Sequence, residues 1–146
     1  MHPYLHAQEN PDKPAVIMAG SGEVITYGEL DKRSNKVAQL YRSRGLKTGD
    51  TVAICMENHP QFFPVTWGSQ RSGLFQVAIS SRLTADEISY ILKDSGAKLL
   101  ISSQKMLPIV DQLRRLNPDI EQLVYGADDE RNMEAALESM PETPIA

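Results

Sequence analysis

The sequence predicts a doubly wound α/β fold: a mostly parallel sheet flanked by helices, with an N-terminal hairpin. Residues 51–56 (TVAICM) form a short apolar run without polar alternation, which is typical of a strand buried on both faces. A helix with Pro60 at its first position and Gly73 just past its end separates this run from a second one at 74–79 (LFQVAI). Two strands joined in this way lie parallel, with a right-handed crossover.

The N-terminal segment precedes this unit and predicts separate, smaller elements. Residues 4–9 are expected to form a short helix that ends at a turn containing Pro11. A short strand at 15–18 and a returning strand at 23–26 flank the sequence Gly-Ser-Gly, which is typical of a hairpin with a flexible tip. That glycine turn is too short to be a phosphate-binding loop.

A long amphipathic helix is predicted after the hairpin. Thr26 and Glu29 have the spacing of a capping box, and Gly45 marks the end of the helix. Residues at helical spacing form one face of this helix, namely Leu30, Ser34, Val37, Ala38 and Tyr41. The charged residues off that face are expected to be a solvated surface, namely Lys32, Arg33, Lys36 and Arg42.

The alternation of strands and helices continues to the end of the chain. Thr84 and Glu87 form a second capping box, which begins a helix that ends at Ser95–Gly96. The later expected elements are a strand at 98–102, a helix at 105–116 with Pro108 in its first turn, a strand at 121–125 and a short helix around 133–140. Four parallel strands result, with no internal repeat.

Composition limits the classes of function. The chain has 146 residues, 41% hydrophobic and 23% charged, which fits about one globular domain. A net charge of −4 makes nucleic acid and anionic membranes poor partners. No apolar run approaches the roughly 20 residues of a membrane helix, and the start lacks the features of a secretory signal. Cys55 is the single cysteine, so an internal disulfide is excluded and a cytoplasmic setting is expected.

The sequence contains none of the familiar phosphate-loop, dinucleotide, zinc or serine-hydrolase motifs. Ligand sites in α/β sheets commonly lie at the carboxyl ends of the strands, so the candidate residues are those that follow each strand. His59, in the turn Glu57-Asn58-His59, could be a general base or an anion contact, although an ordinary loop histidine is the favoured interpretation, and Asn58 is assigned to the turn. The segment 80–84, with Arg82 before a helix, could hold an anion, but capping by Thr84 explains its spacing.

The remaining candidates have structural interpretations. Ser102-Ser103-Gln104 precedes a helix, and capping is favoured. His2 and His6 could share a helical face, but a mobile terminus is favoured over a metal site. Cys55 is expected to be a core residue. Three aromatic residues are expected to pack a helix on the sheet, with an acyl pocket as the alternative: Phe62, Phe63 and Trp67.

Two long segments of the chain carry a family resemblance. PDKPAVIMAGSGEVITYGELDKRSNKVAQLYRSRGLKTGDTVAICMENHPQFF and SGLFQVAISSRLTADEISYILKDSGAKLLI resemble, in order and spacing, the N-terminal part of the adenylate-forming acyl-CoA synthetases of the AMP-binding superfamily. The resemblance is strong over about residues 10–105 and looser beyond, and Ser80-Ser81 stands where the family commonly has Asn-Pro. It implies an α/β subdomain over 1–140 and a linker over 141–146. The family's phosphate loop is expected just beyond Pro144-Ile145-Ala146.

The resemblance also implies a function. The parent enzyme would be an acid–CoA ligase, with a fatty acid as the expected substrate. It would use ATP, Mg and coenzyme A to form an acyl-adenylate and then a thioester. The family's catalytic positions lie downstream, so no catalytic, cofactor-binding or metal residue is assigned in this chain, and the fragment is expected to be inactive and without cofactor.

Truncation is expected to expose apolar surface through which the fragment self-associates. Two alternatives to the ligase remain open. The first is a stand-alone α/β binding or interaction module without catalysis. The second is a flavodoxin-like small-ligand domain with an anion site at Ser80 to Thr84.

Overall fold

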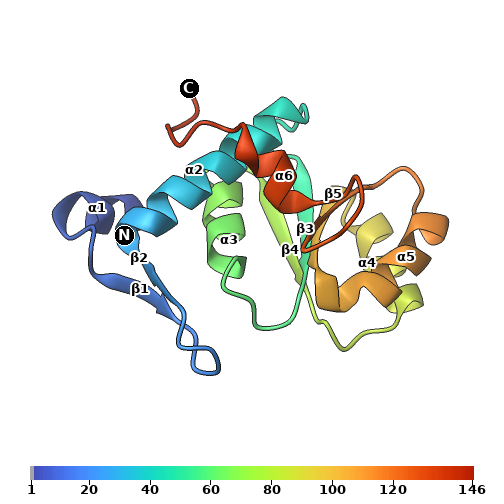
Figure 1. The fold of residues 1–146 in the computed structure, drawn as a ribbon. Helices are drawn as coiled ribbons and strands as arrows, with labels where there is room; N and C mark the ends of the chain where they lie inside the picture. The colour runs from blue at the N-terminus through green and yellow to red at the C-terminus, as the bar shows by residue number, and fades with distance from the viewer. Residues whose placement is uncertain (1) are drawn as a thin grey trace.

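The computed structural model describes residues 2–146 and contains a four-stranded parallel sheet with helices on both faces (Figure 1). The sheet order is β4-β3-β5-β6, and every neighbouring pair is parallel. The strands are β3 (Thr51–Cys55), β4 (Phe75–Ile79), β5 (Ala97–Ser103) and β6 (Glu121–Tyr125). The predicted fold class is therefore confirmed.

Side chains alternate between the two faces of the sheet and build a separate core on each. One core lies under α2 (Tyr27–Ser43), α3 (Phe62–Arg71) and α6 (Met133–Glu138) and includes the strand residues Ile54, Leu99, Ile101 and Leu123. The other lies under α4 (Ala85–Asp94) and α5 (Leu107–Leu116), which follows the 3₁₀ turn η1 (Gln104–Met106), and includes Ala53, Leu100 and Val124. Burial on both faces explains why the strands are apolar without alternation.

The N-terminal elements form a unit beside the main sheet (Figure 1). They are α1 (Pro3–Glu9) and an antiparallel hairpin of β1 (Pro14–Ile17) and β2 (Val24–Thr26). A small third core of Val16, Ile25 and Leu30 attaches the hairpin to the first turns of α2.

The predicted helix signals are largely confirmed. Both capping boxes form, the first at Thr26 with Glu29 and the second at Thr84 with Glu87. Gly45 follows the C-cap of α2 with a φ of 78°, in the left-handed region that glycine adopts at little cost. Gly73 and Gly96 occupy the same place after α3 and α4.

The prediction that Pro60 begins a helix is wrong. The helix starts at Phe62, after the N-cap Gln61. The Gln61 N–H donates to Nδ1 of His59 at 3.1 Å, and the Phe62 N–H donates to the His59 carbonyl at 3.1 Å. The chain therefore makes a tight turn around His59 before α3 begins.

The charged residues of α2 are not all a solvated surface, as the sequence had led us to expect. Lys32 is exposed, whereas Arg33, Lys36 and Arg42 are half-buried. Arg42 donates to the carbonyls of Leu46 and Ser72, both at 2.9 Å. It therefore joins the end of α2 to the end of α3.

The C-terminal segment 141–146 lies against α2. Asn35 donates to the Glu142 carbonyl at 2.9 Å, and Gln39 donates to the Thr143 carbonyl at 2.8 Å. The Arg71 guanidinium fixes Asn35 by donating to its side-chain oxygen. The segment has no regular secondary structure of its own, but hydrogen bonds from α2 fix its position. Among residues 2–146, no helix has both the length and the apolar character needed to cross a bilayer.

Candidate functional site

The strand order reverses at β3. The chain passes from β3 to β4 on one side and then, through α4, to β5 on the other side. Open α/β sheets bind ligands at such a switch point, outside the carboxyl ends of the strands. Here the ends of the strands and the loops that follow them carry Glu57, His59, Ser103, Lys105 and Tyr125, and we call this surface the carboxyl edge.

Two serines join β5 to β3 at the carboxyl edge. The Ser102 hydroxyl donates to the Cys55 carbonyl at 2.6 Å, and the Ser103 hydroxyl donates to the Glu57 carboxylate. The prediction that these serines cap a helix is wrong, because no side-chain cap forms at Ser103. Cys55 and Ser102 are partners in the parallel register, so these hydroxyls reach the neighbouring strand and its loop.

His59 is positioned as a hydrogen-bond donor. Its Nδ1 accepts the Gln61 N–H, so the proton of the neutral ring lies on Nε2. Its ring packs against Tyr125, with centroids 5.5 Å apart and planes tilted by 32°. Within residues 2–146 it forms no hydrogen bond with Ser103 or Glu57, so these residues do not form a nucleophile–base pair. The favoured interpretation of His59 as a loop residue agrees with this geometry.

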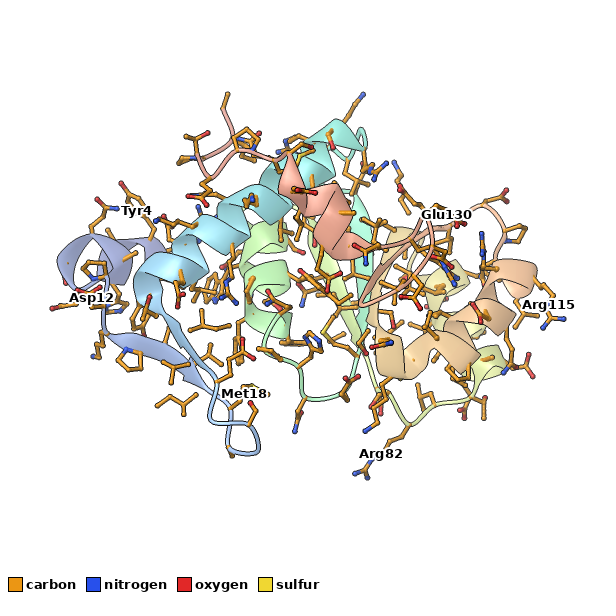
Figure 2. The ribbon with its side chains drawn as sticks, in the orientation of Figure 1. Tyr4, Asp12, Met18, Arg82, Arg115 and Glu130 are labelled. Carbon is orange, nitrogen blue, oxygen red and sulfur yellow. The ribbon has the colours of Figure 1, made fainter. Side chains whose placement is uncertain are left out.

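Two adjoining cavities open at the carboxyl edge. One, of about 350 Å³, is lined by Glu57, His59, Ser103, Lys105 and Tyr125, among others. The second, of about 640 Å³, shares Glu57 and Lys105 and adds Arg82 and the exposed Asn58. Figure 2 shows Arg82 extending away from the loop after β4. Lys105 and the exposed Arg82 thus line the same cavity as Glu57, whose carboxylate accepts a hydrogen bond from Ser103.

The segment 80–84 is confirmed as a helix start. The Thr84 hydroxyl accepts the Glu87 N–H at 3.3 Å, and the Glu87 carboxylate accepts the Thr84 N–H at 2.8 Å. Ser80 Oγ accepts the Arg82 N–H at 3.3 Å. A carboxylate already lies at the N-terminus of α4, and this disfavours binding of a second anion there.

Cys55 is buried at the end of β3, as expected for a core residue. Its thiol contacts the Ser80 carbonyl at 3.8 Å. Burial raises the pKa of the Cys55 thiol to about 11, so the reactive thiolate is scarce at neutral pH.

His2 and His6 do not share a helical face. His2 is the N-cap of α1, where its Nδ1 accepts the Tyr4 N–H at 3.1 Å. The His2 ring packs edge-on against Trp67, with ring centroids 5.1 Å apart, and the His6 and Tyr27 ring centroids are 5.0 Å apart. The segment is therefore packed, contrary to the expectation of a mobile terminus. Across 2–146, no three potential metal-ligating side chains (His, Cys, Asp or Glu) gather.

The aromatic residues of α3 have three different environments. Phe62 packs against the core between α2 and the sheet, as predicted. Trp67 instead packs on the core of the N-terminal hairpin, so that prediction is wrong for Trp67. Phe63 is 43% exposed. A helix turns its side chains in several directions, and α3 lies between the sheet and the hairpin.

Sequence reasoning did not identify Tyr125 or Lys105 as site residues. The signal that could have found Tyr125 is its place as the last residue of a parallel strand, directly before Gly126. Burial raises the pKa of Tyr125 further above its ordinary value of 10.0, and the hydroxyl is a neutral donor at neutral pH. Lys105 lies in the short turn η1, which connects β5 to α5.

Known proteins match both the sequence and the fold. The family model "AMP-binding enzyme" matches residues 4–144. The chain is 35% identical to the fatty acid–[acyl-carrier-protein] ligase ScoC of Streptomyces coeruleorubidus over 115 residues, which are 79% of this chain and 22% of that protein. It is 32% identical to the long-chain-fatty-acid–CoA ligase FadD13 of Mycobacterium tuberculosis over 108 residues, which are 74% of this chain and 22% of that protein. The chain thus spans about a fifth of the length of these relatives.

Solved structures agree with the fold. The N-terminal domain of FACL13 from M. tuberculosis matches with a TM-score of 0.88 and 27% identity, over 99% of this chain and 36% of that chain. The anthranilate CoA ligase AuaEII matches with a TM-score of 0.88 over 97% of this chain and 27% of that chain; its 22% identity speaks for the fold alone. With a family model that covers nearly its whole length and relatives above 30% identity, the chain belongs to the AMP-binding enzyme family.

Proposed function

We propose that this chain is the N-terminal part of an ATP-dependent carboxylic-acid–CoA ligase whose substrate is a fatty acid. The observation that carries the proposal is the family match over residues 4–144, together with the likeness to an N-terminal domain at a TM-score of 0.88. The fatty-acid assignment is supported by the names of the relatives ScoC and FadD13, both fatty-acid ligases.

The proposed reaction has two steps that exchange leaving groups. A carboxylate oxygen attacks the α-phosphorus of Mg-bound ATP, and pyrophosphate leaves. The sulfur of the coenzyme A thiol then attacks the acyl carbon, and AMP leaves. The first step is needed because AMP is a far better leaving group than hydroxide, so the thioester forms from the adenylate and not from the acid itself.

Within that enzyme we assign residues 1–140 to an α/β subdomain and 141–146 to a linker towards the phosphate loop. The end of the last helix, α6, at Glu138 supports this division, and hydrogen bonds from Asn35 and Gln39 to the carbonyls of Glu142 and Thr143 hold the linker against α2. The subdomain supplies a scaffold, and its carboxyl edge supplies one wall of a substrate channel. The proposed location is the cytoplasm, where ATP and coenzyme A are available.

The first prediction is that the 146-residue chain alone has no adenylation activity. We expect no ATP–pyrophosphate exchange above background with fatty acids of several lengths, because the resemblance places the phosphate loop beyond Ala146. The matched control is the same assay on the longer product of the source gene, read past codon 146. Exchange catalysed by the isolated chain would contradict the prediction. A reading frame that ends at codon 146 would instead favour the binding-module alternative.

A further inference from the structure

The linker, residues 141–146, is held by a row of polar side chains on α2 and by one arginine of α3. Asp31, Asn35 and Gln39 follow one another at intervals of four, so they lie along one face of α2. Arg71, the last residue of α3, reaches this row from the side and pairs with Asp31. Figure 1 shows the C-terminal end of the chain beside α2. We call these four residues the linker clamp.

Arg71 determines how the Asn35 carboxamide is oriented. The Arg71 guanidinium donates to the Asn35 side-chain oxygen and, at 2.7 Å, to the Asp31 carboxylate. A guanidinium carries donors only, so it selects the oxygen of the carboxamide and turns the NH₂ group the other way. That NH₂ group donates to the Glu142 carbonyl at 2.9 Å. Arg71 therefore acts on the linker through Asn35.

The burial of these groups fixes the orientation. Asn35 is 2% exposed, and the side chains of Arg71 and Asp31 are 11% and 15% exposed. Water competes little for hydrogen bonds in such surroundings, and a reversed carboxamide would set its NH₂ group against the guanidinium. The clamp thus offers the linker a donor that already points in the required direction, which reduces the entropy lost on docking.

The clamp binds the main chain of the linker. Besides the bond from Asn35, the Gln39 side chain donates to the carbonyls of Thr143 and Pro144, at 2.8 and 3.2 Å. Pro141 and Pro144 restrict the backbone of the linker, so less conformational freedom is lost when it docks. Met140, directly before the linker, packs against the core between α2 and the sheet. The linker is therefore attached at its start by an apolar contact and further along by carbonyl hydrogen bonds.

We propose that the linker clamp positions the phosphate loop of the longer enzyme for binding ATP, with Asn35 and Gln39 as positioning residues and Arg71 acting through Asn35. The inference rests on the proposed ligase, in which that loop follows the linker. A loop whose base is held loses less conformational entropy when it closes on phosphate groups. Release of the linker lowers the fraction of molecules ready to bind ATP, and the apparent dissociation constant rises as that fraction falls.

Docking of the linker is tested in the 146-residue chain by the ¹H–¹⁵N heteronuclear NOE of the Thr143 and Ile145 amides. In the wild type we expect values close to those of α2. Asn35→Asp keeps an acceptor for Arg71 but loses the donor to the linker, and Gln39→Glu loses its donors as well. Both variants should lower the NOE values towards those of a free tail, because the carbonyl hydrogen bonds are lost.

The control for these variants is Gln112→Glu. Gln112 is an exposed glutamine of α5 whose side chain donates to the Pro108 carbonyl at 3.2 Å, within its own helix. The substitution makes the same chemical change as Gln39→Glu, and it should leave the NOE values of the linker unchanged.

A second pair of variants tests whether Arg71 acts through Asn35. Arg71→Met and Asp31→Asn both remove the ion pair, and each should lower the melting temperature. Only Arg71→Met frees the Asn35 carboxamide to turn, so it should also lower the NOE values of the linker. Asp31→Asn leaves Arg71 facing Asn35 and should keep the linker docked.

The role in ATP binding is tested by pyrophosphate exchange with the longer gene product at a series of ATP concentrations. Asn35→Asp and Gln39→Glu should each raise the KM for ATP about tenfold, the effect of one lost hydrogen bond, and leave kcat nearly unchanged, since saturating ATP restores docking. A merely structural role would lower kcat through loss of folded enzyme and leave the KM unaltered. Gln112→Glu should alter neither constant.

Several results would overturn the proposal. Docking fails if the wild-type linker has the NOE values of a free tail, or if Asn35→Asp and Gln39→Glu leave them unchanged. Equal linker NOE values in Arg71→Met and Asp31→Asn would contradict the action of Arg71 through Asn35. A fall in kcat at constant KM would contradict positioning for ATP. A longer product without any exchange would contradict the proposed ligase, and with it the role in ATP binding, while the NOE values would still decide whether the clamp holds the linker.

Discussion

Arg131 carries a buried charge that fixes one loop of the molecule. Its side chain is 8% exposed and pairs with Asp129 at 2.6 Å and with Asp111 at 2.8 Å. It also donates to the Gln122 side-chain oxygen at 3.1 Å, while Gln122 donates to the Val110 carbonyl at 2.8 Å. The loop after β6 is thereby joined to α5. A buried guanidinium is tolerated here because several acceptors share its donors.

Asp129 should make folding stability depend on pH in the acid range. Its hydrogen bond from Arg131 lowers the pKa of Asp129 from 3.8 to about 2. Because the folded pKa lies below the unfolded one, the stabilisation is complete above about pH 4 and is lost as pH falls towards 2. We therefore expect the stability difference between wild type and Asp129→Asn to shrink over that interval. Urea unfolding followed by circular dichroism at a series of pH values measures it.

The control for this pH dependence is the Asp129→Asn substitution in a variant that lacks the Arg131 side chain. In an Arg131→Met background, the effect of Asp129→Asn on stability should vary much less with pH, because the side-chain hydrogen bond from Arg131 is the largest cause of the lowered pKa and only the backbone N–H of residue 131 still donates to Asp129. A stability difference that stays constant from pH 4 to pH 2 in the wild-type background would contradict the prediction.

At the scale of elements, α2 and α3 cross with their backbones close together. A Cβ atom added at Gly68 would lie 2.5 Å from Val37 Cγ1 and 2.7 Å from Val37 Cβ. The Cβ of Val37 cannot rotate away, since it is attached to the backbone of α2. A glycine inside α3 is therefore required by packing, although it lowers helix propensity by about 1 kcal/mol relative to alanine.

Gly68→Ala should lower the free energy of unfolding by about 2 kcal/mol, because overpacking outweighs the gain in propensity. Chemical denaturation measures the change. Gly20→Ala is the control and should have little effect, since no heavy atom lies within 4 Å of its Cβ position. The double variant Gly68→Ala with Val37→Ala should lose less than the sum of the two single losses. Additive losses would show that the two residues are not in contact.

A feature could be predicted from the sequence when the residues that form its hydrogen bonds are close together in the chain. The capping boxes at Thr26 and Thr84 form hydrogen bonds between residues three apart, and Gly45 ends a helix locally. A short sequence pattern was therefore enough to predict them. Trp67 and Ser103 were misassigned because their contacts are tertiary. Ser103 reaches a loop 46 residues earlier in the chain, and only the order of the sheet brings that loop near.

The same distinction applies to the candidate sites. The alternation of elements predicts a ligand site at the ends of the parallel strands. The structure brings Glu57, Ser103 and Tyr125 together around one cavity there. A cavity of about 790 Å³ lined by Arg33, Pro64, Tyr125 and Leu137 was not predicted. It depends on the last short helix packing beside α2 and on the orientation of Tyr125 at the end of β6. No neighbouring residue in the sequence indicates that Arg33 Nη1 and the Tyr125 hydroxyl lack hydrogen-bond partners among residues 2–146.

At the scale of the whole molecule, the two edge strands of the sheet, β4 and β6, differ in how far other segments cover them. The Val124 N–H of β6 donates to the Arg131 carbonyl at 2.7 Å, so the following loop partly covers that edge. Among residues 2–146, β4 pairs only with β3, and it exposes Phe75 and Ala78. Its sequence, FQVAI, has neither the lysine nor the proline that commonly protects an edge strand. The proposed self-association is therefore assigned to the β4 edge.

Phe75→Lys should shift the chain from oligomer towards monomer, because a charge on the open edge opposes strand pairing and removes exposed apolar surface. Sedimentation velocity over a range of protein concentrations measures the change. Tyr90→Lys is the matched control, since Phe75 and Tyr90 are both 68% exposed but Tyr90 belongs to helix α4 and not to the edge strand. Equal effects of the two substitutions would indicate general surface hydrophobicity as the cause. A wild-type chain that remains monomeric at high concentration would contradict self-association itself.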